Sequence, residues 1–377
     1  MYKTTIGNAF ASNTAECALA SQRKNSIVNC VELTIQSCLG WAPGADELIR
    51  NYGLSKTRLK GRLRRWYSRL VSKYIPSTNN PKLPHQVVAN PDRQGIALVM
   101  IVKNEARYLN EWIAFHCMLG VRHIYIYDNM SDDDVVGTVK NSRFADRVTV
   151  TRWGNLHMRR QNMAYNHCIA TFGGDYRWMG FLDADEFVFP VHCDSLPIAF
   201  EAFEQQPCLA VYWHMFGTSG HTNRPEGLVI ENYNMREPFP PPKTVKSLCK
   251  VFVDPSQVVA AGVHVFEMRD IGAVNITQSG ISFDQYCDQN SALYEGEILQ
   301  LNHYYTRSKQ DYQEKLERGG VARLTGADER RNLVEKRIEQ IEASPVRDAT
   351  IQRFIEPLKA MMQLPENGVG GHDNGQL

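Results

Sequence analysis

Between residues 95 and 182, short apolar runs alternate with stretches of helical periodicity, and this order constrains the fold more than any other feature. The run IALVMIV, from Ile96 to Val102, contains no polar residue, which is typical of a strand buried on both faces. Three later runs have strand character, and two helix-like stretches that end in glycine lie among them. Strands that alternate with helices predict a Rossmann-like α/β fold, with a mainly parallel central sheet flanked by helices.

The rest of the chain divides into segments of different composition. Residues 1–75 are expected to form an N-terminal region with a basic amphipathic helix, and residues 76–94 a linker rich in proline and asparagine. The α/β domain is expected to occupy residues 95–325. Residues 326–364 are expected to form C-terminal helices, and residues 365–377 a disordered tail.

Composition narrows the class of protein. Apolar residues make up 43% of the 377-residue chain and charged residues 22%, which is the balance of a globular protein. The net charge of +1 gives no field that attracts nucleic acid, so no nucleic-acid partner is expected. No apolar run is long enough to span a bilayer, and the N-terminus lacks the pattern of a secretory signal. The nine cysteines include no C-x-x-C pair, so no structural zinc site is expected. Their odd number in a long chain favours reduced thiols in the cytoplasm over a disulfide framework.

The segment from Lys56 to Lys73 carries eight basic residues and no acid. Its apolar residues recur at helical spacing, so it reads as a basic amphipathic helix. Such a helix is able to lie on an anionic membrane surface, which would make the protein peripheral on the inner face of the membrane. The alternative is a helix that packs on its own domain with a solvated basic face.

Polar side chains follow three of the predicted strands at the points where the strands end. Asp183 and Asp185 follow the fourth strand, Asp128 ends the second, and Lys103–Glu105 follow the first. Ligands of open α/β sheets bind beyond the carboxyl ends of the strands, so these groups should converge on one edge. Alternation along an extended segment would place Asp183 and Asp185 on the same side. Two carboxylates there would suit a hard cation that keeps positions open for phosphate oxygens.

These residues carry a resemblance to a known family. A D-x-D after an apolar strand resembles the metal motif of glycosyltransferases of the GT-A fold that use nucleotide sugars. Four ordered blocks are similar to glycosyltransferase family 92, and equally to bacterial family-2-like glycosyltransferases: IVKNEARYLNEWIAFHCMLGVRHIYIYDNMSDDD, WMGFLDADEFVFP, FGTSGH and LNHYYTRSKQDYQEKLERGG. The resemblance covers roughly residues 95–320, a length that suits one domain. The block DNMSDDD departs from the usual D-N-x-S-x-D, and Asp132 and Asp133 both fit its last position.

The resemblance implies a reaction and a set of site residues. A sugar would move from a nucleoside-diphosphate sugar, most simply a UDP-sugar, to a glycan or lipid-linked saccharide acceptor. Mn²⁺ or Mg²⁺, held by Asp185 with Asp183 and His303, would neutralise the departing diphosphate. The residues implied to bind the nucleotide and its diphosphate are Lys103, Asn104, Glu105, Asp128, Asn129, Lys315 and Arg318.

The family is also thought to invert the anomeric carbon, which requires a general base for the acceptor hydroxyl. Glu231, in GLVIENY, and His221, in FGTSGH, are the candidates, and Glu186 is a third. Glu186 has a structural alternative, because a buried carboxylate beside the motif could instead pair with a buried arginine.

Two other functions fit parts of the pattern. In one class of phosphatases the first strand also ends in D-x-D. The first aspartate of that motif, here Asp183, attacks phosphorus beside Mg²⁺. Those enzymes continue D-x-D-x-T/V on their first strand, whereas this chain has Phe187 in the last place and the motif on the fourth strand. A protein that binds nucleotide sugar without turnover is the remaining alternative. Release of a nucleoside diphosphate, or of phosphate, distinguishes the three.

Overall fold

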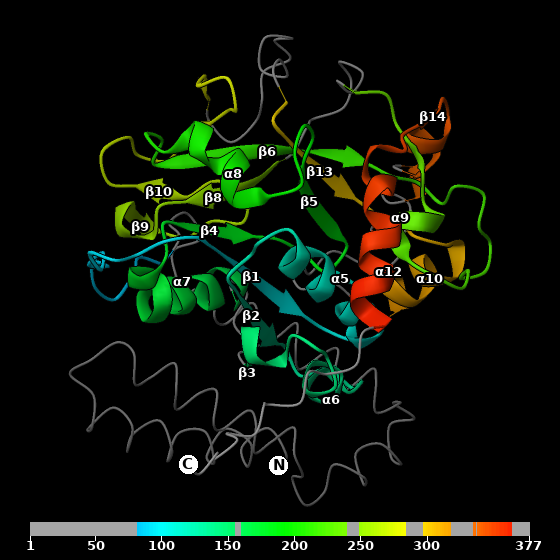
Figure 1. Cartoon of the computed structure of the whole chain (residues 1–377), viewed down its shortest axis with the longest axis horizontal. Helices are drawn as coiled ribbons and strands as arrows, with labels where there is room; N and C mark the ends of the chain where they lie inside the picture. The colour runs from blue at the N-terminus through cyan, green and yellow to red at the C-terminus, as the bar shows by residue number, and fades with distance from the viewer. Residues whose placement is uncertain are drawn as a thin grey trace, which may run out of the picture. The chain divides into compact units, whose positions relative to one another are not determined.

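A computed structural model of the chain describes residues 81–154, 160–239, 249–283, 297–317, 335–336 and 338–363. Its centre is an eight-stranded sheet (Figure 1). In spatial order the strands are β3 (Val148–Arg152), β2 (His123–Asp128), β1 (Ile96–Val102), β4 (Trp178–Phe181), β8 (Cys249–Val253), β6 (Cys208–Met215), β13 (Leu299–His303) and β5 (Glu186–Pro190).

The sheet is mainly parallel. β3, β2, β1 and β4 pair in parallel, β8 runs antiparallel to both β4 and β6, and β6 pairs in parallel with β13. β5 closes the edge antiparallel to β13. Six strands therefore share one direction and only β8 and β5 oppose it, which confirms the predicted fold class.

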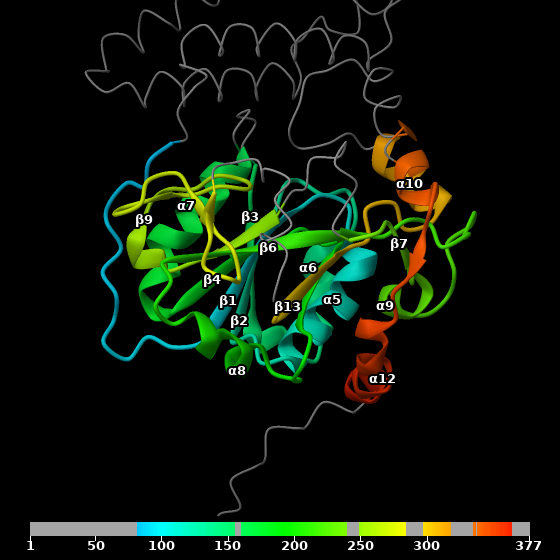
Figure 2. The ribbon, with the colours of Figure 1, turned by 90° about the horizontal axis from the view of Figure 1, so that it is seen from above.

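Helices cover the sheet and gather at one of its ends. The helices are α5 (Ala106–Met118), α6 (Val135–Lys140), α7 (Arg160–Phe172), α8 (Leu196–Phe200), α9 (Val229–Asn232), α10 (Lys309–Glu317) and α12 (Ile355–Gln363). In both overall views α9, α10 and α12 lie together at the end toward which the arrows of β6 and β13 point (Figures 1 and 2). Three two-stranded ribbons complete the described structure: β9 (Val258–Ala260) with β10 (Glu267–Met268), β11 (Asn275–Ile276) with β12 (Ser282–Phe283), and β7 (Met235–Arg236) with β14 (Val346–Arg347).

Strand β1 is apolar throughout because each of its faces packs in a separate core. Ile96, Leu98 and Met100 contribute to a core with α5, α6, α8 and α12. Ala97 and Val99 contribute to a second core on the other face, with α7. Successive side chains of a strand point to opposite faces, so a strand covered on both sides needs apolar residues at every position.

Residues 81–94, which the sequence analysis assigned to a linker, pack on the domain. The Leu83 amide donates to the Val259 carbonyl at 2.9 Å, and the Asn90 amide donates to the Gly174 carbonyl at 2.9 Å. Val87 is buried in the second core, and Arg93 forms an ion pair with Asp254 at 2.5 Å. The Pro-rich composition of this segment gave no sign of these contacts. No helix within the described ranges is long and apolar enough to cross a membrane.

The D-x-D segment links the middle of the sheet to its edge. The chain leaves β4 at a central position and enters β5 at the far edge, so Asp183 to Glu186 must turn between them. The Glu186 amide donates to the Asp183 carbonyl at 3.0 Å, which closes this turn. The expectation that an extended segment places Asp183 and Asp185 on one side is therefore wrong, because a turn points its successive side chains in different directions.

Candidate functional site

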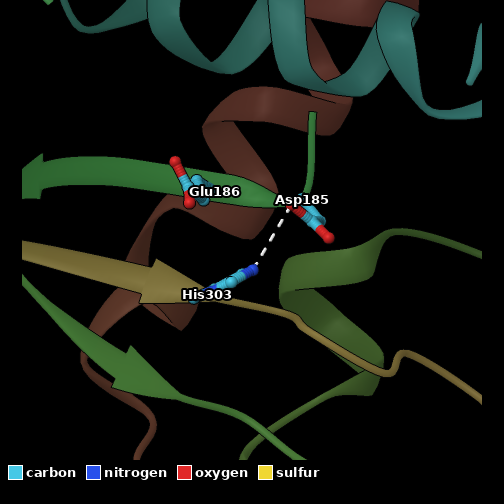
Figure 3. Close-up of side chains that lie close together, drawn as sticks. All are labelled: Asp185, Glu186 and His303. Atoms are coloured by element: carbon cyan, nitrogen blue, oxygen red, sulfur yellow. Dashed lines mark ion pairs between the residues drawn. The ribbon is translucent and has the colours of Figure 1, made fainter. Parts of the chain in front are cut away.

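Strand register brings three potential metal ligands together. In the pairing of β13 with β5, His303 is the direct partner of Glu186. The Tyr304 amide, one residue further along, donates to the Asp185 carbonyl at 2.8 Å. Asp185, Glu186 and His303 thus each place one ligand atom within 4.8 Å of the others (Figure 3). All three side chains are buried.

Asp185 is ionised and faces two nitrogen groups. Its Oδ1 lies 3.5 Å from Nε2 of His303, and its Oδ2 lies 2.5 Å from Nζ of Lys315 on α10. Burial alone would raise the pKa of this carboxyl, but the charge of Lys315 and the contact with His303 hold it well below its usual range. Burial lowers the pKa of His303, so its imidazole is neutral near pH 7 and its nitrogen can act as a ligand.

Asp183 and Glu186 share a buried lysine on β8. The Lys250 side chain is 0% exposed, and its Nζ lies 2.8 Å from Oδ2 of Asp183 and 3.5 Å from Oε2 of Glu186. The partner of Glu186 is thus a buried lysine, not the buried arginine that the structural alternative predicted. Asp183 is the more open of the two acids, with 39% of its side chain exposed. The turn therefore separates the motif: Asp183 faces Lys250, and Asp185 faces His303 and Lys315.

The carboxyl group of Glu186 has the least favourable surroundings in the cluster, because it is fully buried. Burial raises the pKa of its carboxyl well above the usual range, even though Lys250 opposes this shift. Its Oε2 accepts a hydrogen bond from the Asp183 amide at 2.9 Å, whereas its buried Oε1 has no hydrogen-bond partner among the residues that the structure describes. A buried carboxylate oxygen without a partner is costly, and a cation is one group that satisfies it.

The residues present fit a divalent cation. Carboxylate oxygens are the preferred ligands of Mg²⁺ and Mn²⁺, and an imidazole nitrogen is a common ligand of first-row divalent ions. Asp185, Glu186 and His303 supply this mixed set, and one carboxylate oxygen of Glu186 has no hydrogen-bond partner among the described residues. The sequence analysis predicted Asp183, Asp185 and His303 as the metal ligands. In the structure Asp183 forms an ion pair with Lys250, and the third member of the cluster is Glu186 instead of Asp183.

Arg307 ties the D-x-D turn to the loop that follows β1. Its guanidinium is buried, donating to Oε2 of Glu105 at 2.9 Å and to the Ala184 carbonyl at 3.0 Å. It also lies over the Tyr108 ring, 3.5 Å from the ring centre. Arg307 adopts a left-handed backbone, with φ of 51°, which a non-glycine residue rarely does outside a functional or tightly packed site. Sequence reasoning missed Arg307 and Lys250, since their partners lie far away in the chain.

The loops after β1 and β2 hold each other in place. Asn104, with φ of 55°, accepts a hydrogen bond from the Asp132 amide at 2.8 Å. Asp128 accepts one from the Ser131 amide at 3.0 Å, and Lys103 donates to the Met130 carbonyl at 3.1 Å. The predicted nucleotide residues Lys103, Asn104, Glu105, Asp128 and Asn129 thus lie on two interlocked loops at one edge of the sheet.

The two alternatives for the last aspartate of DNMSDDD have different contacts. Asp132 interacts with Asn104, whose Nδ2 lies 3.3 Å from its Oδ2. Asp133 accepts a hydrogen bond from the Ala106 amide at 2.8 Å, at the start of α5, where a negative charge also complements the helix dipole. Asn129 is buried, and within the described part of the chain its Oδ1 has no hydrogen-bond partner.

A cavity of about 320 Å³ opens beside Asp185. It is lined by Asn104, Ala106, Arg107, Tyr108, Asp133, Asp185, Arg224, Tyr304, Tyr305, Thr306, Arg307, Asp311, Glu314 and Lys315. Arg224 forms an ion pair with Asp311 at 2.6 Å, which joins the segment after β6 to α10. The cavity is therefore lined by Asp185 of the D-x-D, by residues of the two loops that follow β1 and β2, and by Asp311, Glu314 and Lys315 of α10.

Comparison with known proteins assigns the family. Residues 98–344 match the sequence profile of glycosyltransferase family 92, which covers well over half of the chain. The chain belongs to glycosyltransferase family 92. A family 92 protein of Oryza sativa subsp. japonica is 31% identical over 191 residues, 49% of this chain and 32% of that protein. One of Ricinus communis is 26% identical over 277 residues, 71% of this chain and 49% of that protein. The chain thus matches a third to a half of the length of these relatives.

Two solved glycosyltransferases superimpose on the chain with low scores. Residues 1–349 of TarS of S. aureus, solved with UDP-GlcNAc, superimpose with a TM-score of 0.29 at 10% identity, covering 59% of this chain and 64% of that fragment. The mannosyltransferase PcManGT of Pyrobaculum calidifontis, solved with GDP-Man and Mn²⁺, gives a TM-score of 0.24 at 14% identity, covering 40% of this chain and 44% of that protein.

The remaining predicted residues of this family 92 protein lie elsewhere. Glu231, on α9, forms an ion pair with Lys359 of α12 at 2.7 Å, with 38% of its side chain exposed. His221 has its Nε2 3.2 Å from the Asn232 carbonyl. Neither residue lines the cavity beside Asp185. Arg318 lies outside the described residues, as does the basic segment from Lys56 to Lys73.

Proposed function

We propose that this family 92 protein is a metal-dependent, inverting glycosyltransferase that moves a sugar from a nucleoside-diphosphate sugar to a glycan or lipid-linked saccharide. The observation that carries the proposal is the cluster of Asp185, Glu186 and His303 next to Lys315, at the edge of a mainly parallel sheet. Ligands of such sheets bind at this edge, and a cation between carboxylates is the usual partner of substrate phosphates.

In this proposal Asp185 and His303, with Glu186 or Asp183, hold Mn²⁺ or Mg²⁺. The cation would neutralise the charge that grows on the departing diphosphate. Lys315 brings a second positive charge to the same cavity and acts on the same oxygens. Arg307 holds the D-x-D turn against Glu105, so that the carboxylates are positioned before substrate arrives. The interlocked loops of β1 and β2 would receive the nucleotide, and Arg318 remains a proposed diphosphate ligand.

The structure gives less support to the two alternative functions, a phosphatase and a protein that binds nucleotide sugar without turnover. A phosphatase would need Asp183 as a free nucleophile, but its Oδ2 lies 2.8 Å from Nζ of the buried Lys250. A protein that binds nucleotide sugar without turnover would have the same cavity. Only a measurement of activity distinguishes it from a transferase.

A screen of nucleoside-diphosphate sugars, with UDP-sugars first, tests the proposal. Purified protein is incubated with each donor and Mn²⁺ or Mg²⁺, and free nucleoside diphosphate is measured, since slow donor hydrolysis reports the transferase even without its acceptor. We expect release with at least one donor, and none after chelation of the metal. Phosphate release from small phosphoesters would contradict the proposal and favour the phosphatase, whereas donor binding without release from any donor would favour the binding protein.

We further propose that the protein acts in the cytoplasm and contacts the membrane through the segment from Lys56 to Lys73. The five cysteines within the described ranges are free thiols, which suits a reducing compartment. Each basic residue near an anionic surface contributes about 1 kcal/mol to binding. Co-sedimentation with vesicles is the test: the protein should pellet with anionic but not neutral vesicles and be released by high salt. A protein that ignores anionic vesicles at low salt would contradict the contact.

A further inference from the structure

One partly exposed histidine near the D-x-D is held in a defined protonation form. His264 lies in the loop between β9 and β10. The ring Nδ1 of His264 is 2.9 Å from the Cys249 carbonyl oxygen. The side-chain amide of the buried Asn275 donates to the backbone carbonyl of His264 at 2.9 Å. Both the ring and the backbone of this residue are therefore fixed by groups of the folded sheet.

The contact with Cys249 decides which ring nitrogen carries the proton. A carbonyl oxygen only accepts hydrogen bonds, so Nδ1 must donate and Nε2 keeps its lone pair. Among the described residues, Nε2 makes no hydrogen bond. Burial, followed by the nearby charge of Lys250, lowers the pKa of His264 to about 4, so the ring is neutral near pH 7. A neutral imidazole with a free, oriented nitrogen is the form that accepts a proton.

His264 also lies beside the cluster described above. Its ring makes an edge contact with Trp213 at 5.2 Å between ring centres, and Trp213 also contacts the ring of His303 at 4.4 Å and lies 6.0 Å from Nζ of Lys250. Cys249, which fixes the ring, immediately precedes Lys250, the partner of Asp183. The charged and titratable groups that act on His264 are Lys250, Asp183 and His303, all members of the site or its support.

We propose that Nε2 of His264 is the general base of the transfer reaction, an inference that rests on the proposed function. The acceptor hydroxyl gives its proton to Nε2 as its oxygen bonds to the anomeric carbon. The bond from that carbon to the diphosphate oxygen breaks, and the diphosphate leaves with the electron pair. The imidazolium then returns its proton to water. No other reactant is needed, and the Cys249 carbonyl stabilises the imidazolium through Nδ1.

The other candidates for the base are less available. Glu231 is paired with Lys359, and Nε2 of His221 faces a backbone carbonyl, so that nitrogen is a donor. Glu186 is 0% exposed and lies within the cation cluster. His264, like Glu231 and His221, does not line the cavity of about 320 Å³ beside Asp185. It differs from them in having a fixed tautomer and a ring nitrogen that accepts no hydrogen bond from a described residue.

The test compares His264→Gln and His264→Ala with the wild type, using the donor identified by the screen. We expect kcat to fall by about 10²- to 10⁴-fold, the usual contribution of a general base. The affinity for the nucleoside diphosphate with Mn²⁺, measured by calorimetry, should stay within about twofold, and the melting temperature should not change. Added imidazole should restore part of the activity of His264→Ala. His192→Gln, at an exposed histidine after β5, is the matched control and should behave as the wild type.

Several results would overturn the proposal. Retention of more than a tenth of the wild-type kcat in His264→Gln would do so, as would a loss confined to nucleotide affinity. Nitrogen NMR of the histidine rings gives a test that needs no turnover, because His264 should be neutral and protonated on Nδ1 at pH 7. A proton on Nε2 in the neutral form would rule out the base. A wild type that releases no diphosphate from any donor would refute the proposed function itself, and the base with it.

Discussion

At the scale of single residues, the site consists of buried charges that neutralise one another. Lys250 is 0% exposed between Asp183 and Glu186, and Arg307 is buried against Glu105. Isolated charges are unstable in a protein interior, so the ammonium of Lys250 and the guanidinium of Arg307 depend on these acidic partners. The same groups hold the ligand atoms of the cluster in place, so its geometry and its folding energy are linked.

Lys250→Met tests this dependence. The change keeps the unbranched shape and most of the length of the side chain but leaves Asp183 and Glu186 without their shared cation. Breaking a buried ion pair by removing one partner costs about 3 kcal/mol or more, and we expect a loss of about 3 kcal/mol in urea unfolding because Asp183 is partly hydrated. Lys359→Met, which breaks the solvent-exposed pair with Glu231, is the control and should leave the free energy of unfolding close to that of the wild type. Equal losses in the two variants would show that Lys250 is not a buried counter-charge.

At the scale of helices and strands, sequence patterns located most elements but not their long-range contacts. The apolar β1, the helices α5 and α7 and the strand ends that carry Asp128 and Asp185 follow from periodicity and strand order. The turn at the D-x-D does not, because it depends on β5 crossing to the sheet edge beside β13. Lys250 and Arg307 were missed for the same reason, since their acidic partners lie 67 and 202 residues away.

The contact between α5 and β5 gives a prediction about pH. His116 of α5 is fully buried, and its Nε2 accepts a hydrogen bond from the Val188 amide at 3.3 Å. Burial lowers its pKa to about 3. The folded protein therefore leaves this ring neutral, whereas the unfolded chain takes up a proton below about pH 6.5. Its contribution to stability is present above pH 6.5 and is lost as the pH falls toward 3.

His116→Gln removes this titration while keeping a donor and an acceptor in the side chain. Between pH 7 and 4.5 the wild type should lose about 2 to 3 kcal/mol more stability than the variant, at up to about 1.4 kcal/mol per pH unit. Urea unfolding at both pH values measures the difference. The comparison between the two proteins is needed because burial raises the pKa of Glu111 to about 7, an effect of opposite sign that both share. Parallel pH curves would contradict the assignment of a neutral buried His116.

At the scale of the whole molecule, the functional domain begins earlier than composition suggested. The family match begins at residue 98, but residues 81–94 already pack on the domain through Leu83, Val87 and Arg93. Such contacts are formed with residues that lie far along the chain, so a Pro-rich composition alone does not reveal them. The N-terminal boundary of a stable fragment should therefore lie near residue 80.

Two deletions test this boundary. A protein lacking residues 1–80 should bind nucleoside diphosphate and Mn²⁺ with an affinity within about twofold of the full chain. A protein lacking residues 1–94 should melt at a lower temperature, because it loses the buried Val87 and the ion pair of Arg93 with Asp254. Calorimetry and thermal unfolding measure the two effects. If the protein lacking residues 1–80 is soluble but does not bind nucleoside diphosphate, the N-terminal region helps to build the pocket.

The measurement that tests the central claim most directly is metal-dependent diphosphate release by the wild type and by Asp185→Asn. The variant keeps the size of the side chain but removes the charge that faces His303 and Lys315. We expect Mn²⁺ to stimulate release by the wild type, and we expect the variant to lose about 10²- to 10³-fold in kcat. The variant should stay folded, as judged by circular dichroism. Near-wild-type release by Asp185→Asn, or release that persists after chelation of all metal, would contradict the account.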